Sequence, residues 1–413
     1  MTRRVVVTGC GLISCLGLNK EENFKALAQG QNGIDKITQF DARQFISRIA
    51  GEIKDFNPEL HFLKKDLRRV DRFVQIAMAA SKEAVSESGL DLSSQNPYRV
   101  GVVIGSGIGS LYAVEEQYKL FLDRGPSRLS PFMIPRLITN EAAGQVAIHF
   151  GCRGVNLCTV TACASGSHAI ADAFRSIKYN EADIIISGGT ESCITYMGVG
   201  GFCALKALST RNDDPKKASR PFDKNRDGFV IAEGVGIVVL EELEHARKRG
   251  ANIYAEIVGA GKTCDAYHIT APEPSGEPAA KAMEFALAEA KMAADEVDYI
   301  NAHGTSTFLN DKTETKAIKL ALGRHAKKVS ISSTKSMTGH MLGAAGSAEF
   351  VMCCFMIQNS IVFPTINLEE PDPECDLDYT PNKLKEMPLE FVLTNSLGFG
   401  GHNITLALKK FRG

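Results

Sequence analysis

The sequence has no apolar run long enough to cross a membrane. Among its 413 residues the richest apolar stretch is residues 350–357, far below the roughly 18–20 residues that a membrane helix needs. The first ten residues, MTRRVVVTGC, turn polar too early for a secretory signal. These absences point to a cytoplasmic protein, although the mature form of a plastid or mitochondrial protein would look the same.

The chain also lacks an excess of charge of one sign. Lys and Arg total 47 against 48 for Asp and Glu, so the net charge is −1. A protein that binds nucleic acid normally shows a basic excess, which disfavours nucleic acid as the main partner. Any electrostatic docking site must therefore be a local patch.

Signals for cofactors are equally sparse. The 11 cysteines show no CxxC pairs with histidines, so no zinc site is expected, and we expect reduced thiols. The segment GSGIGS, residues 105–110, lacks the third glycine of a dinucleotide loop, and no acidic residue completes that fingerprint. We therefore expect neither a metal nor a nucleotide cofactor.

Short β-branched segments alternate with alanine-rich segments of helical spacing, which predicts α/β layers with a largely parallel sheet. The predicted strands of the first half are residues 4–9, 100–105, 155–160 and 183–188. The predicted helices are residues 20–29, 71–88, 140–150 and 165–179. The scheme then repeats, since residues 253–261 (IYAEIVGAG) echo residues 4–11 (RVVVTGCG). We predict two similar halves, residues 1–250 and 251–413, related by a pseudo-twofold axis.

Cys163 lies where a predicted strand runs into a predicted helix. The N–H groups at a helix start favour negative charge, so we expect a lowered thiol pKa. The small residues Ala164, Ser165 and Gly166 leave room for an acyl group beside the sulfur. One cysteine among eleven would ordinarily be a core residue, but this flanking pattern favours a nucleophile.

Two later segments carry histidines in polar surroundings. His303, in NAHGTST, follows a predicted strand, and open α/β sheets place ligand sites at such strand ends. Thr305 and Thr307 in the same loop offer two hydroxyls on one side. His340, in STKSMTGHMLGAAG, precedes a helix of small residues. A single histidine is more often structural, but the position of His303 favours chemistry.

Two further features accompany these loops. Glu349 lies among apolar residues and would need a cationic partner if buried, for which Lys335 is the candidate; a solvated pair is an equal alternative. Phe399, in NSLGFGGHN, is hemmed in by glycines. That context suits a gate or a backbone donor to an oxyanion, although a plain turn would also explain it.

Together these motifs resemble the β-ketoacyl-acyl carrier protein synthases of the thiolase-like fold, in particular the elongating type II enzymes. The matching stretches run in order along nearly the whole chain: TACASGSHAI, GGTES, ALSTRND, SRPFDKNRDGFV, NAHGTST, SSTKSMTGHMLGAAG and NSLGFGGHN. The resemblance implies an α/β fold of two similar βαβ-rich halves layered α-β-α-β-α, and a homodimer. It also implies substrates carried on the phosphopantetheine arm of acyl carrier protein.

The resemblance further implies a decarboxylative Claisen condensation in fatty-acid elongation, which joins an acyl group on Cys163 to malonyl-acyl carrier protein. His303 and His340 would hydrogen-bond the malonyl thioester oxygen. The other implied roles are support by Lys335 and Glu349, an oxyanion site at Cys163 and Phe399, pantetheine contacts by Thr305 and Thr307, and an acyl pocket near Ile108 and Phe202. Phe308 departs from the family, which commonly has proline after HGTST; proline would restrict the loop's φ.

A basic stripe is the candidate docking site for the acidic carrier protein. Lys64, Lys65, Arg68, Arg69 and Arg72 fall at three- and four-residue spacings and would face together in a helix. Such runs are usually only solvated faces, but the resemblance favours docking, chiefly through Lys65, Arg68 and Arg69.

Three other functions compete with this interpretation. A Cys–His thioesterase or amidase would need a water path, and two histidines with a gating Phe would be surplus to it. A non-condensing partner subunit of a polyketide-type pair would lack the cysteine. A biosynthetic thiolase would use a second cysteine as base, and none accompanies the two histidine loops.

Overall fold

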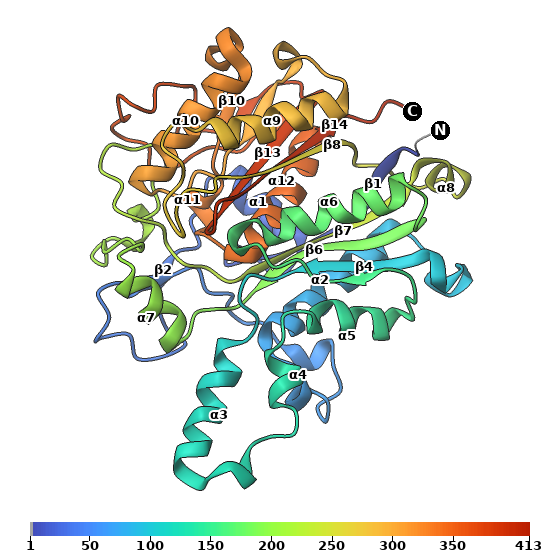
Figure 1. The fold of residues 1–413 in the computed structure, drawn as a ribbon, viewed down its shortest axis with the longest axis vertical. Helices are drawn as coiled ribbons and strands as arrows, with labels where there is room; N and C mark the ends of the chain where they lie inside the picture. Colours follow the sequence, from blue (N-terminus) through green and yellow to red (C-terminus); the bar gives the residue numbers. More distant parts are fainter. Residues whose placement is uncertain (1–2) are drawn as a thin grey trace.

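A ten-stranded sheet runs through the centre of the protein, in the order β10-β9-β13-β14-β8-β1-β7-β6-β4-β5 (Figure 1). The computed structural model describes residues 3–413. The strands of this sheet are β1 (Val5–Ile13), β4 (Val100–Gly105), β5 (Asn156–Leu157), β6 (Ile184–Glu191), β7 (Gly234–Glu242), β8 (Ala255–Cys264), β9 (Tyr299–Asn301), β10 (Ser330–Ser332), β13 (Phe391–Gly398) and β14 (His402–Lys409). Two small sheets pair β2 (Asp35–Lys36) with β3 (Ile49–Ala50) and β11 (Ile361–Val362) with β12 (Lys385–Glu386).

Some helices cover the outer faces of the sheet, and others lie between its two halves. They are α1 (Lys20–Ala28), α2 (Arg72–Ser88), α3 (Leu111–Arg124), α4 (Met133–Leu137), α5 (Glu141–Phe150), α6 (Ser165–Lys178), α7 (Tyr196–Ala204), α8 (Leu243–Lys248), α9 (Glu277–Ala290), α10 (Phe308–Leu322), α11 (Lys335–Thr338) and α12 (Ala345–Asn359). Within residues 3–413, none of the helices combines the length and the apolar character that crossing a membrane requires.

The strand order of the first half recurs in the second. The order β1-β7-β6-β4-β5 matches β8-β14-β13-β9-β10, with the same parallel and antiparallel neighbours. The halves join where β1 pairs antiparallel with β8. The prediction that one scheme occurs twice in the chain is therefore confirmed. The expectation of a largely parallel sheet is wrong, because β7 and β14 each run antiparallel to both neighbours.

The helices α6 and α12 form the central layer (Figure 1). Helix α6 packs on β4 and β6 and also touches β14, while α12 packs on β7 and β13. Both central helices therefore contact strands of both halves. Helices α2 and α5 cover the outer face of the first half, and α9, with α10 beside it, covers the second. This order gives the expected α-β-α-β-α layering.

Small residues let the two central helices approach closely. Gly166 of α6 lies against Ser347 of α12, and Gly346 of α12 lies against Ser167 of α6. A β-carbon on Gly346 would collide with the hydroxyls of Ser167 and Ser396, which hydrogen-bond each other at 2.9 Å. This contact brings the N-terminal ends of α6 and α12 together, and with them the Cys163 and His340 segments.

We expect Gly346→Ala to lower the free energy of unfolding by about 1–3 kcal/mol, because the added methyl overpacks a tight contact and breaks the serine pair. The matched control is Gly144→Ala in α5, where a β-carbon meets nothing within 4 Å. That change should be neutral or stabilising by about 0.5–1 kcal/mol, from helix propensity. Urea unfolding of both variants measures the difference. Equal stabilities would show that the α6–α12 contact can accommodate a methyl group at residue 346 without loss of stability.

Candidate active site

Cys163 lies in a single 3-10 turn, residues 162–164, directly before α6. Ala162 begins this turn with φ +50°, a left-handed conformation that costs an alanine about 1–2 kcal/mol. The second half contains the same turn before α12, in which Leu342 has φ +48°. Gly343 there occupies the position of Cys163. The fold thus contains this strained turn twice, and only the copy in the first half carries a thiol.

Burial dominates the electrostatics of the thiol. Cys163 is only 8% exposed. Loss of hydration raises the pKa of its thiol to about 12, while the charge of Lys335 and the N–H of Phe399 act in the opposite direction. The lowered pKa expected from the helix start is therefore wrong, because burial outweighs it. The Cys163 thiol is therefore neutral at pH 7.

His303 and His340 meet at one point although they are far apart in the chain. Their ring centroids lie 5.3 Å apart with planes at 84°, and each residue is 2% exposed. Burial lowers the pKa of both imidazoles well below the usual value, and the nearby charge of Lys335 lowers it further. Both rings are therefore neutral at pH 7, so each carries one N–H to donate.

Lys335 and Glu349 form the predicted buried ion pair behind His303. Their Nζ and Oε1 atoms lie 2.5 Å apart, and both residues are 1% exposed. Lys335 Nζ also lies 3.5 Å from Nδ1 of His303, at the long end of hydrogen bonding. A cation at Nδ1 makes that atom the acceptor and leaves the ring proton on Nε2. The pair therefore fixes the tautomer of His303.

Glu314 of α10 is a site residue that the sequence motifs do not single out. Its carboxyl group accepts the N–H of His303 at 2.7 Å and the N–H of Gly304 at 2.8 Å. Burial raises the pKa of Glu314 to about 7. The available signal was an acidic residue three positions after Asp311 in the first turns of a helix. Spacing alone could not reveal its two backbone partners.

A cavity of about 520 Å³ joins these groups. Cys163, His303 and His340 all line it. The other predicted substrate-contacting and gating residues line the same cavity: Thr305, Thr307, Ile108, Phe202 and Phe399. The hydroxyls of Thr305 and Thr307 lie 2.9 Å apart. All the predicted catalytic, gating and substrate-contacting residues therefore line one cavity, and the supporting pair Lys335 and Glu349 lies behind its wall.

Phe399 lies in the tight turn between β13 and β14. Gly400 and Gly401 have φ of +86° and +77°, which a glycine adopts without strain. Gly398 packs so closely on the Cys163 turn that a β-carbon would lie 3.3 Å from the amide nitrogen of Cys163. The N–H of Phe399 lies close enough to the Cys163 thiol to lower its pKa, against the larger effect of burial. Two backbone N–H groups, of Cys163 and Phe399, thus adjoin the sulfur.

The basic stripe is not one continuous helix. A 3-10 turn carries Arg68 and Arg69, and α2 begins only at Arg72. Lys65, Arg68 and Arg69 are exposed, as a docking surface requires. The expected grouping of Arg72 with them is wrong, because its Nε lies 2.7 Å from the buried Glu233.

The sequence has relatives of known function. Residues 2–246 match the family described as "Beta-ketoacyl synthase, N-terminal domain", and residues 254–369 match "Beta-ketoacyl synthase, C-terminal domain". A 3-oxoacyl-(acyl-carrier-protein) synthase 2 from Synechocystis sp. is 52% identical over 410 residues, 99% of both chains. The protein of the same name from Staphylococcus aureus is 50% identical over 409 residues, again 99% of both.

Solved structures share the whole fold. The ketosynthase of a type II polyketide synthase, in complex with its acyl-carrier protein, is similar with a TM-score of 0.92 at 35% identity, covering 100% of both chains. A β-ketoacyl synthase from Burkholderia phymatum has a TM-score of 0.92 at 34% identity, covering 99% of this chain and 100% of that one. The α/β fold expected from the resemblance is confirmed.

We expect Lys335→Met to lower the free energy of unfolding by about 3–5 kcal/mol, because it leaves the Glu349 carboxylate buried and unpaired. The double variant Lys335→Met with Glu349→Leu replaces both charges by apolar groups and should regain most of that loss. Urea unfolding of the two variants tests this. A double variant as unstable as the single one would show that Glu349 is not the group that needs Lys335.

Proposed function

The chain belongs to the β-ketoacyl synthase family, and we propose that its cavity performs the condensation with Cys163 as the acyl carrier. The reaction is that of a 3-oxoacyl-(acyl-carrier-protein) synthase: an acyl group joins malonyl-acyl carrier protein, giving 3-oxoacyl-acyl carrier protein and CO₂ in fatty-acid elongation. One observation supports this assignment of roles above all. A thiol and two neutral imidazoles line a single cavity.

The first half-reaction is acyl transfer to Cys163. The sulfur attacks the carbonyl carbon of the acyl thioester, and the thiol proton passes to the departing pantetheine sulfur. The N–H groups of Cys163 and Phe399 stabilise the tetrahedral oxyanion, and removing one such donor typically costs about 10²–10³ in rate. The pliable glycines beside Phe399 let its ring move as the acyl chain enters past Ile108 and Phe202.

The second half-reaction forms the carbon–carbon bond. The Nε2–H of His303 and an N–H of His340 bind the malonyl thioester oxygen, so negative charge develops there as CO₂ leaves. The resulting enolate carbon attacks the acyl thioester on Cys163, and the cysteine sulfur is expelled. Lys335 and Glu349 hold His303 in the donating tautomer throughout. Thr305 and Thr307 contact the pantetheine arm, and no separate cofactor takes part.

We propose that the protein works as a homodimer through the face of α3. Helices α3 and α4 project from the body of the molecule (Figure 1). Large apolar side chains of α3 are exposed there: Tyr112, Tyr118, Phe121 and Leu122. Monomeric proteins rarely leave so many such groups together in water. A second copy, related by a twofold axis, would cover this face with its own.

We also propose that the two halves divide at residues 250 and 251 and that the enzyme resides in the cytoplasm. The division falls between α8 and β8, where the topological repeat begins again. All eleven cysteines have free thiols, which suits a reducing compartment.

We expect Cys163→Gln to abolish condensation and to retain decarboxylation of malonyl-acyl carrier protein, since His303 and His340 remain. Its decarboxylation rate should stay flat between about pH 6 and 8, because both imidazole pKa values lie well below 6.5 and both rings stay neutral. Product analysis by mass spectrometry measures both activities, with Cys163→Ala as the second non-condensing variant.

Two outcomes would contradict these roles. A folded Cys163→Gln variant that loses decarboxylation together with condensation would remove the separate task given to the histidines. A parent enzyme that releases free acid from acyl- and malonyl-carrier protein, without any 3-oxoacyl product, would be a hydrolase.

Reversing the charges of Lys65, Arg68 and Arg69 to glutamate should raise KM for carrier-bound substrates by about tenfold or more, because the carrier protein is acidic. The activity on short free thioesters, which need no docking, should stay unchanged. Lys409→Glu, at an exposed lysine of β14, is the matched control. An equal rise in KM for both kinds of substrate would place the effect in the cavity rather than on the docking surface.

A further inference from the structure

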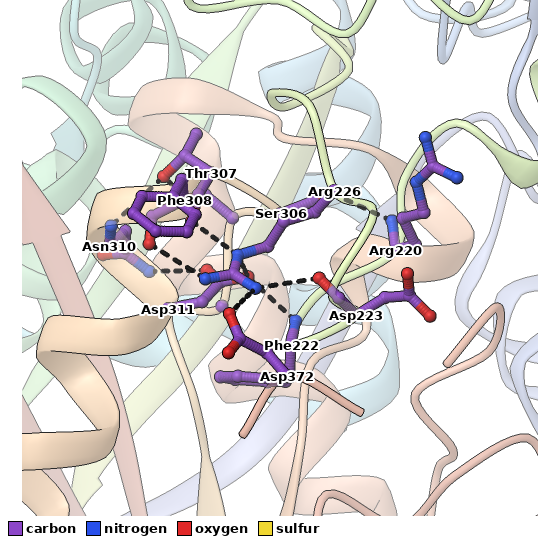
Figure 2. Close-up of polar contacts among 12 residues, drawn as sticks. Arg220, Phe222, Asp223, Arg226, Ser306, Thr307, Phe308, Asn310, Asp311 and Asp372 are labelled. Atoms are coloured by element: carbon purple, nitrogen blue, oxygen red, sulfur yellow. Dashed lines mark hydrogen bonds and ion pairs between the residues drawn. The ribbon is translucent and has the colours of Figure 1, made fainter. Parts of the chain in front are cut away.

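A buried arginine lies beneath the loop that carries Thr305 and Thr307. The side chain of Arg226 is 0% exposed. Its Nε donates to the carbonyl oxygen of Thr307 at 3.1 Å, and its Nη2 donates to that of Phe308 at 3.0 Å (Figure 2). The guanidinium therefore donates hydrogen bonds to two successive carbonyl groups, at the point where the loop continues into α10.

Two carboxylates hold this guanidinium in place. Arg226 Nη1 lies 2.7 Å from Asp372 Oδ2, and Nε lies 3.5 Å from Asp311 Oδ2 (Figure 2). Nη1 also donates to the carbonyl of Asp223 at 2.8 Å. The planar fork serves all these acceptors at once, which the single ammonium of a lysine cannot do. The network therefore ties two distant segments, residues 307–311 and the one that carries Asp372, to one rigid cation.

The segment that carries Arg226, residues 220–228, also makes hydrogen bonds to Ser306, which lies between Thr305 and Thr307. Ser306 has φ +68°, a conformation that a serine keeps only where its surroundings impose it. The N–H of Gly228 donates to the Ser306 carbonyl at 3.1 Å, and the N–H of Arg220 donates to its hydroxyl at 3.0 Å. Contacts from one segment thus fix both Ser306 and the loop's exit.

Phe308 covers the guanidinium on the side facing solvent. Its ring is 53% exposed, and Arg226 Cζ lies 5.1 Å from the ring centroid, a cation–π distance. Phe308 is the first residue of α10 and follows the capping Thr307. Proline fits this first position and would fix φ there, whereas phenylalanine leaves φ free. The restraint at this point must therefore come from contacts, and Arg226 supplies them.

We propose that Arg226 is a positioning residue for the hydroxyls of Thr305 and Thr307, with Phe308 as its cover. The inference rests on the proposed function, in which these hydroxyls contact the pantetheine arm. Arg226 acts through the loop and not on the reacting atoms. Its loss therefore weakens the binding of pantetheine-carried substrates and leaves the thiol and the two imidazoles in place.

The test is Arg226→Lys, which keeps the charge and removes the fork. KM for malonyl-acyl carrier protein should rise by about tenfold, the value of one or two lost charged hydrogen bonds, with kcat within about twofold. Alkylation of Cys163 by iodoacetamide, which has no pantetheine arm, should proceed at the parent rate. A merely structural defect would slow kcat and alkylation as well.

Phe308→Pro supplies the second arm of a double-mutant cycle. Proline restores the φ restraint, so Arg226→Lys should raise KM in that background by only about threefold or less. If Arg226→Lys fails to fold, Asp372→Asn takes its place. This variant weakens one ion pair of the same guanidinium and should also raise KM, by a smaller factor.

An unchanged KM in folded Arg226→Lys overturns the proposal, and so does an equal rise in both backgrounds. Loss of kcat and of alkylation together with KM also overturns it. The dissociation constant for holo-acyl carrier protein, measured alongside, tests the loop without any condensation step. A parent that forms no 3-oxoacyl product would instead refute the proposed function, while the change in dissociation constant would still decide the role of Arg226.

Discussion

The close contact between α6 and α12 is the constraint on which the site depends. Each helix places a glycine against a serine of the other, so their axes approach more closely than larger side chains would allow. Because the Cys163 turn precedes α6 and the His340 segment precedes α12, this approach sets the separation of the Cys163 thiol from the His340 ring. Chemistry and core packing therefore share one set of contacts, and neither can change without the other.

A single buried cation organises the charges around that contact. Lys335 opposes the effect of burial on the Cys163 thiol and acts together with burial on His303 and His340, lowering the pKa of both rings. Glu349 is what makes the cation tolerable in the interior, since an unpaired ammonium there would lose its proton or disrupt the packing. The two imidazoles are therefore neutral hydrogen-bond donors at neutral pH. Such donors suit the enolate of the proposed reaction better than a general acid whose pKa lies near neutral pH.

Helices, strands and the chemically distinctive side chains could be predicted from the sequence. The strand at residues 100–105 and the helix beginning at Ser165 occur as predicted. The strand expected over residues 155–160 shortens to β5, because the chain leaves the sheet to form the Cys163 turn. Glu314 and Arg226 escaped notice for a different reason. Glu314 accepts from backbone groups 10 and 11 residues before it, and Arg226 donates to backbone groups 81 and 82 residues after it. No spacing pattern records such contacts.

The pseudo-twofold repeat also places the same turn in two different surroundings. In the second half the N–H of Gly343, which corresponds to that of Cys163, donates to the carboxyl group of Glu191 at 3.1 Å. The same carboxyl group accepts the N–H of Gly107 at 2.7 Å. A side chain of the protein therefore accepts the N–H of the second-half turn, whose counterpart in the first half is a proposed oxyanion donor. The repeated turn is a structural tie in the second half and, in the proposed mechanism, the oxyanion site in the first.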